Sequence, residues 1–93
     1  MIVGLLELEV FIPESNSLKS RRMVLQSLKA RLRHEFNIAV SQVDDADKWQ
    51  KATLAVVGVA KDRRNMNSTL SQVLNFVESS GSISLIDHRM EMF

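Results

Sequence analysis

Basic side chains that could contact phosphates are concentrated between residues 17 and 36. Six of the twelve Lys and Arg residues lie in this segment, and no acid occurs between Glu14 and Glu35, although the formal net charge of the chain is only +1. Lys and Arg displace counterions from phosphates, which supplies most of the sequence-independent affinity of a protein for nucleic acid. The segregated charge therefore indicates a local surface for polyanions.

Helical spacing arranges part of this charge in a line. At about 1.5 Å rise per residue, the cations from Lys19 to Arg33 cover roughly 20 Å of one helix. A solvated helix face is the alternative interpretation, with the last cations complementing the helix dipole. The residues that we expect to contact nucleic acid are Lys19, Arg22, Lys29, Arg31, Arg33, Lys61, Arg63 and Arg64.

Other combinations of reactive residue types are weak. The chain has no cysteine, which excludes disulfides, thiolate metal sites and Cys nucleophiles. The acidic triplet of Asp44, Asp45 and Asp47 lacks the alternating ligands, the glycine and the distal Glu of a calcium loop. His34 and His88 have no companion at a metal-ligand spacing. We therefore expect no catalytic residue, no metal and no cofactor, and hence a protein that is not an enzyme.

Two helices would position the basic residues. In the segment 17–36, five apolar side chains recur within one narrow sector of a helix at about 100° per residue. Asn16 or Ser17 is expected to cap this helix. The second helix is expected to begin after Asp62, which can cap it, and to have Gly81 as its C′ residue. The apolar stripe of the first helix is Leu18, Leu25, Leu28, Leu32 and Phe36.

Strand patterns surround these helices. Residues 2–12 alternate with period two, and we expect the even positions to face the core. Residues 38–43 alternate in the same way, residues 52–60 are almost uninterrupted apolar sequence, and residues 83–92 form the last strand. The order βαββαβ predicts an α+β ferredoxin-like sandwich, a four-stranded antiparallel sheet in the order 4-1-3-2 with both helices on one face. At 93 residues, we expect a single domain over 1–93.

This topology also predicts which ends meet. The far end of the first helix, with Arg31 and Arg33, is expected at the same end as the loop at residues 61–64. The start of that helix would lie beside the acidic hairpin at residues 44–47 and form ion pairs with it. If Gly4 faces Gly58, the two glycines leave a hollow that Leu32 or Phe36 would fill, whereas a bulge is the alternative role of a strand glycine.

The uncovered face of the sheet is predicted to be unsuited to RNA. Glu7 and Glu9 would lie on it, with Arg89 paired to one of them across the strands. It lacks the aromatic residues on which bases stack. Its apolar residues form a patch too large to leave in water, so we expect a homodimer through this face. The residues expected in self-association are Val3, Leu5, Val43, Val57 and Val59.

Several short motifs carry a resemblance to a known family. They are S-L-K-S-R-R at 17–22, L-K-A-R-L-R at 28–33, F-N-I-A-V at 36–40, D-K-W-Q-K-A at 47–52 and N-F-V-E-S at 75–79. With them, nearly the whole chain resembles the YlxP-like family of small bacterial proteins. The resemblance implies a ferredoxin-like fold, no catalytic residues, and a gene neighbourhood often shared with a translation initiation factor and a ribosome-binding factor. Gln42 departs from the family, where an acid is expected.

Together these observations predict a non-catalytic RNA- or ribosome-associated binding module in the cytoplasm. Its apolar N-terminal run lacks a basic region and is interrupted by Glu7 and Glu9, so we expect neither a signal peptide nor a membrane partner. The alternative is a regulatory or interaction module that dimerises through its sheet and binds a small metabolite or a protein. Acylphosphatase-like hydrolysis is a third interpretation, but the loop at 13–16 lacks the required glycine and arginine.

Overall fold

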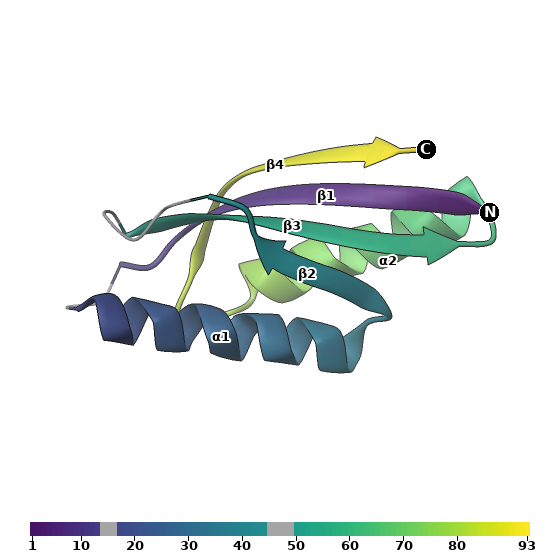
Figure 1. Cartoon of the computed structure of the whole chain (residues 1–93). Helices are drawn as coiled ribbons and strands as arrows, with labels where there is room; N and C mark the ends of the chain where they lie inside the picture. The colour runs from purple at the N-terminus through teal and green to yellow at the C-terminus, as the bar shows by residue number, and fades with distance from the viewer. Residues whose placement is uncertain (14–16, 45–49) are drawn as a thin grey trace.

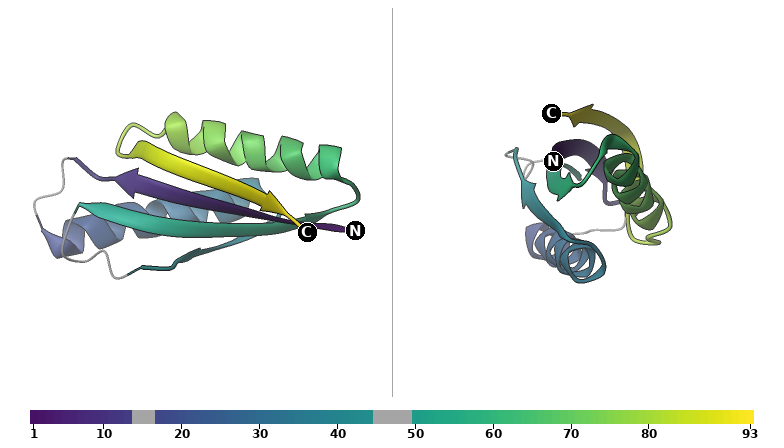
Figure 2. Two further views of the ribbon diagram at one scale, coloured as in Figure 1. Left: turned by 90° about the horizontal axis from the view of Figure 1, so that it is seen from above. Right: turned by 90° about the vertical axis from the view of Figure 1, so that its right-hand side faces the viewer.

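Two helices pack against one face of a four-stranded sheet in the computed structural model, which describes residues 1–13, 17–44 and 50–93 (Figure 1). The strands are antiparallel and follow the order β2-β3-β1-β4. Both helices lie on the same side of the sheet in each view of Figure 2. The predicted α+β ferredoxin-like fold is confirmed. The elements are β1 (Ile2–Phe11), α1 (Leu18–Glu35), β2 (Ile38–Gln42), β3 (Lys51–Ala60), α2 (Arg63–Glu78) and β4 (Ser84–Met92).

The core lies between the sheet and the helices, where the two periodicities of the sequence meet. Even-numbered positions of β1 point inward, and Leu6, Leu8 and Val10 are completely buried. The helices contribute apolar residues three and four positions apart, as expected for one buried face of each helix. The buried helix residues are Leu25, Leu28 and Leu32 of α1 with Met66, Leu70, Val73 and Val77 of α2. Neither helix in the described part of the chain combines the length and apolar character that a membrane crossing requires.

Side chains cap the start of each helix as predicted. The Ser17 hydroxyl accepts a hydrogen bond from the backbone N–H of Ser20 at 3.1 Å. The carboxylate of Asp62 accepts one from the N–H of Asn65 at 2.8 Å. Each bond satisfies an N–H that has no partner within the helix. Because Asp62 lies only two residues after β3, it places the start of α2 at the end of the sheet.

The prediction for the end of α2 was wrong. The helix ends at Glu78, and its cap, Ser79, keeps a right-handed backbone with φ −85° and ψ −1°. The Ser79 hydroxyl donates to the carbonyl of Phe76 at 3.1 Å. No described glycine has a positive φ, so Gly81 is not a left-handed C′ residue. A serine side chain closes this helix and makes the glycine unnecessary there.

The predicted register of Gly4 opposite Gly58 is confirmed, but neither Leu32 nor Phe36 fills the hollow. A Cβ on Gly4 would lie 2.6 Å from Cγ of Met66, and one on Gly58 would lie 3.1 Å from its Cε. Met66 belongs to the first turns of α2, which begin directly beneath this end of the sheet. Phe36, at the end of α1, packs instead against Phe76 of α2.

Candidate nucleic-acid interface and the open sheet face

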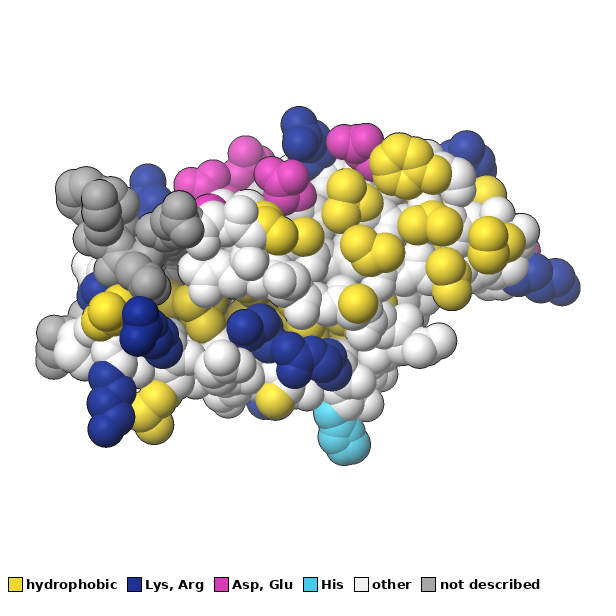
Figure 3. Space-filling model, in the orientation of Figure 1, with side chains coloured by type: hydrophobic (Ala, Val, Ile, Leu, Met, Phe, Trp, Pro, Cys, Tyr) yellow, Lys and Arg dark blue, Asp and Glu magenta, His cyan; other side chains and the backbone are white. Residues whose placement is uncertain are grey.

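One side of α1 carries a line of four cations. The buried leucines of α1 mark the sector of the helix that faces the core. At about 100° per residue, the four cations follow each other along one side of that sector. Figure 3 shows Lys and Arg side chains following the helix below β2. We call this surface the basic flank. It consists of Lys19, Arg22, Lys29 and Arg33.

In the described part of the chain, neighbouring carboxylates do not neutralise three of the four cations of the basic flank. Within residues 1–13, 17–44 and 50–93, Lys19, Lys29 and Arg33 have no carboxylate within salt-bridge distance. Lys19 and Arg33 are exposed, and Lys29 is half-buried. Their charges therefore remain available to an external anion.

Arg31 lies on the opposite side of α1, toward α2. Its guanidinium carbon is 5.7 Å from the centroid of the Phe76 ring, and its Nη2 donates to the hydroxyl of Ser80 at 3.3 Å. Phe36 packs edge-on against the same Phe76 ring, with centroids 5.8 Å apart. Arg31 thus helps join the two helices. The structure separates it from Arg33, its neighbour in the predicted site.

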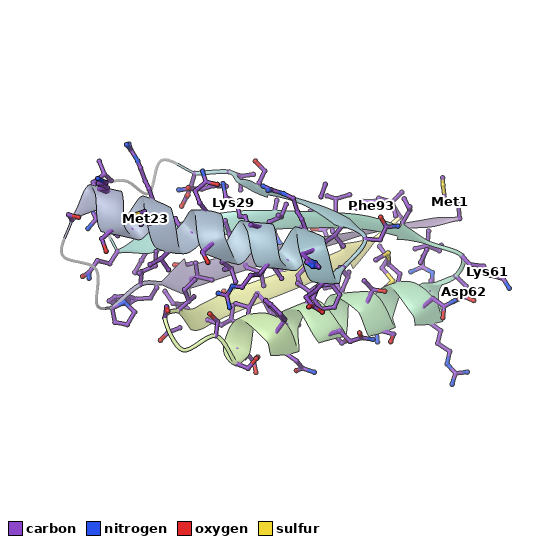
Figure 4. All side chains as sticks on the ribbon, turned by 90° about the horizontal axis from the view of Figure 1, so that it is seen from below. Met1, Met23, Lys29, Lys61, Asp62 and Phe93 are labelled. Carbon is purple, nitrogen blue, oxygen red and sulfur yellow. The ribbon has the colours of Figure 1, made fainter. Side chains whose placement is uncertain are left out.

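The three cations at the start of α2 form a separate group. Lys61, Arg63 and Arg64 are exposed where β3 ends, and we call them the basic turn. Phe36, at the end of α1, packs against Phe76, which lies about 20 Å along the axis of α2 from Arg63. Figure 4 accordingly shows Lys61 beyond the end of α1, on the side away from Met23. Ile38, just after α1, pairs with Gly58 of β3, so the end of α1 and this loop lie at the same end of the sheet as predicted, but their cations do not form one cluster.

The acids expected near the start of α1 lie mostly outside the described residues. Asp45 and Asp47 fall outside the described residues, and so do the ion pairs predicted with these two acids. Asp44 is described, and its carboxylate accepts hydrogen bonds from the N–H of Thr53 at 3.0 Å and from Nε2 of Gln42 at 3.2 Å. An acid at position 42 could not donate this second bond when ionised. The amide thus secures the turn after β2.

The uncovered face of the sheet is divided into an apolar end and a charged end. Strand register places Val3 beside Val59, and backbone bonds of 3.0 and 2.8 Å join Val3 to Phe93. The next row contains Leu5 and Val57, with Glu91 beside Leu5 on β4. Figure 3 shows hydrophobic side chains gathered toward the end of the molecule that carries the chain termini, with acidic ones beyond them. We call this surface the apolar end; it consists of Val3, Leu5, Val57, Val59 and Phe93.

Val43 does not belong to the apolar end. Its N–H bonds to the carbonyl of Thr53 at 2.9 Å, which places it in the row of Glu9. Rows on one face of a strand repeat every two residues, or about 6.8 Å. Val43 therefore lies roughly 14 Å from the row of Leu5 and Val57. Of the five residues predicted for self-association, the structure brings together the other four.

The charged end follows in the next two rows. Arg89 lies 3.3 Å from the carboxylate of Glu7 and 3.7 Å from that of Glu91, which confirms the predicted cross-strand pair. One row further, Glu9 and Asp87 face each other beside a break in the β1–β4 register. Acids outnumber cations here, so this end repels phosphate. We call Glu7, Glu9 and Asp87 the acidic rows.

Sequence reasoning missed Phe93 as part of the apolar end. The signal was present, because Arg89 and Glu91 are on the open face and the same alternation places Phe93 there. Its distance from the central strands in the sequence hid the contact with Val3. Among the described residues, no group of three or more His, Asp and Glu side chains could hold a metal ion.

Comparison with known proteins agrees with the motifs. A family profile described as "Protein of unknown function (DUF503)" matches residues 3–90. The chain is also similar to "Uncharacterized protein YlxP" of Bacillus subtilis (strain 168), with 30% identity over 92 residues. That alignment covers 99% of this chain and 100% of the Bacillus protein. The matched residues include the whole basic flank and the basic turn.

Proposed function

We propose that the basic flank of α1 binds the phosphate backbone of structured RNA in this chain, which belongs to the DUF503 family of proteins of unknown function. The protein would act as a non-catalytic binding module in the cytoplasm, on free RNA or on RNA within a ribosomal particle. Recognition would depend on shape and charge, as is common for base-paired RNA.

The observation that carries this proposal is that Lys19, Lys29 and Arg33 of the basic flank have no carboxylate at salt-bridge distance in the described part of the chain. Lys19 and Arg33 are separated by about 20 Å along the helix, which is long enough to contact several phosphates at once. In the described part of the chain, neither has an acid at salt-bridge distance. Binding an RNA would therefore break no existing ion pair of these two residues.

The other layer of the molecule supports the same orientation. The acidic rows lie on the face of the sheet that points away from the helices. Their charge would repel RNA, whereas the basic flank would attract it, so the field of the protein itself orients the complex.

The remaining cations of the predicted site have smaller roles in this proposal. Arg31 already contacts Phe76 and Ser80, and it faces away from the basic flank. The basic turn lies about 20 Å beyond the helix contact at Phe76, so only an extended RNA would reach both surfaces. We therefore expect the energy of binding to come mainly from the basic flank.

Binding of a fluorescently labelled RNA duplex, measured by anisotropy at several salt concentrations, tests this proposal. The variant Arg33→Ala should bind more weakly, and the slope of log K against log salt should fall by about one. Lys51→Ala is the matched control, because it removes the same charge from an exposed residue on β3. Equal effects of the two variants, or binding that does not respond to salt, would contradict the proposal.

A further inference from the structure

The apolar end leaves a continuous hydrophobic surface in water. Val57, Val59 and Phe93 are 39%, 55% and 64% exposed, and Met1 beside them is 91% exposed. Phe93 is held on this surface by its two backbone bonds to Val3, although it is the last residue of the chain. Apolar surfaces of this kind on single domains commonly mark an interface.

Charges on either side of the apolar end have opposite sign. The basic turn follows β3 directly, beyond the row of Val59. On the other side, the acids begin with Glu91 at the edge of the Leu5 row and continue in the acidic rows. Along the strands, the order of the surfaces is therefore basic, apolar, acidic. If a second copy lies over this surface in the opposite direction, the basic part of each copy therefore faces the acidic part of the other.

We infer that a second copy of this chain covers the apolar end, with the strands of the two copies running in opposite directions. The two-fold axis lies within the interface and crosses the strands between the rows of Val3 and Leu5. The Val3 row of one copy then faces the Leu5 row of the other. The acidic rows of each copy extend over the basic turn of its partner. An isologous dimer of this kind is closed and does not form filaments.

The open face of the sheet is somewhat smaller than one side of an interface of standard size. The four strands contain 10, 5, 10 and 9 residues. At about 4.8 Å between strands and about 3.4 Å per residue, they give an open face of roughly 550 Å². A specific interface of standard size buries about 800 Å² on each partner. The dimer is thus expected to be of modest strength and to depend on protein concentration.

RNA fits this face less well than a second copy. The apolar end has no cation among its five residues, and the adjacent acidic rows repel phosphate. The dimer also leaves both basic flanks uncovered, since α1 lies on the opposite side of the sheet. The inference therefore stands independently of the proposed RNA binding.

Sedimentation equilibrium of the full chain over a wide concentration range tests the inference. The average mass should rise from 10.5 kDa toward twice that value. Phe93→Glu should raise the dimer dissociation constant at least about tenfold, because it would bury a charge in the apolar contact. Met23→Glu is the matched control, since Met23 on α1 is also 64% exposed. A constant mass of 10.5 kDa, or equal effects of both variants, overturns the inference.

A charge exchange tests the direction of the two copies. Glu7→Lys and Lys61→Glu should each weaken the dimer, because the stated axis places the Lys61 row opposite the Glu7 row, whereas the double variant should recover most of the lost association. Failure of the double variant to recover would overturn this arrangement. Circular dichroism verifies that each variant is folded, and Val59→Asp serves as a second disruption of the apolar contact that does not involve the terminal residue.

Discussion

The basic flank of α1 and the charged end of the open sheet face use the same residue types with different results. Arg33 on the helix has no carboxylate within reach in the described part of the chain, whereas Arg89 on β4 lies between Glu7 and Glu91. Both surfaces are exposed, and both belong to layers that share one core. The difference lies in the number of acids near each surface and in the period at which side chains repeat on a helix and on a strand.

Helical and strand periods explain this difference. On α1, residues at spacings of three, four and seven come to one side, and every charged residue there is basic. On the sheet, charges of different strands also become neighbours, so a cation of β4 meets an acid of β1 through the register. Local sequence therefore decides the charge of the flank, while strand pairing decides the charge of the face.

The largest difference between the two surfaces is expected when the charges on each are reversed in turn. The double variant Lys29→Glu and Arg33→Glu should lower RNA affinity about 100-fold, since contacts are lost and repulsion is added. Reversing Arg89 to Glu should change that affinity less than about threefold, because the acidic rows already repel RNA. Anisotropy titrations at one salt concentration measure both. Similar losses would mean that total charge, not the flank, governs binding.

A smaller effect is expected at the glycines that let the two layers approach. Gly4→Ala should destabilise the fold by about 1–3 kcal/mol, because the new Cβ overlaps Met66 and Leu70. Gly81→Ala is the control, since a Cβ there meets nothing within 4 Å. Chemical denaturation measures both free energies of unfolding. Equal stabilities of the two variants would show that α2 moves easily away from the sheet.

Variants of Arg31 and Arg33 are expected to distinguish an effect on folding stability from an effect on RNA binding. Arg31→Ala should lower the free energy of unfolding by about 0.5–1 kcal/mol through the lost contact with Phe76. It should leave RNA affinity near that of the parent protein. Arg33→Ala should show the opposite pattern. Urea denaturation and anisotropy on the same samples distinguish them, and a matching loss of affinity in both would place Arg31 in the interface.

The smallest effect is expected for the exposed ion pair of the sheet. The side chains of Arg89 and Glu7 are 69% and 42% exposed, so their attraction is strongly screened by water. Arg89→Ala should therefore change the free energy of unfolding by less than about 0.5 kcal/mol. A loss above about 1 kcal/mol in urea denaturation would show that β4 depends on this pair far more than its exposure suggests.

Much of the architecture was predictable from local pattern. Alternation in residues 2–12 identified the core face of β1, and the serine and aspartate caps marked the starts of both helices. The Gly4–Gly58 register, which the sequence left as a condition, and the expected pairing of Arg89 with Glu7 or Glu9 also agree with the structure. These features depend on neighbours in sequence or on a fixed antiparallel geometry, and both are constrained by short-range sterics.

The sequence by itself determined that α1 has a cationic side and that the open face of the sheet carries both apolar and acidic residues, because side-chain direction follows from helical and strand periods. Only the tertiary structure decided how far the helices overlap. The packing of Phe36 on Phe76 directs Arg31 toward α2, and Met66 fills the space beneath Gly4. These outcomes depend on the axial position of one helix against another, which is set by side-chain volumes from distant segments.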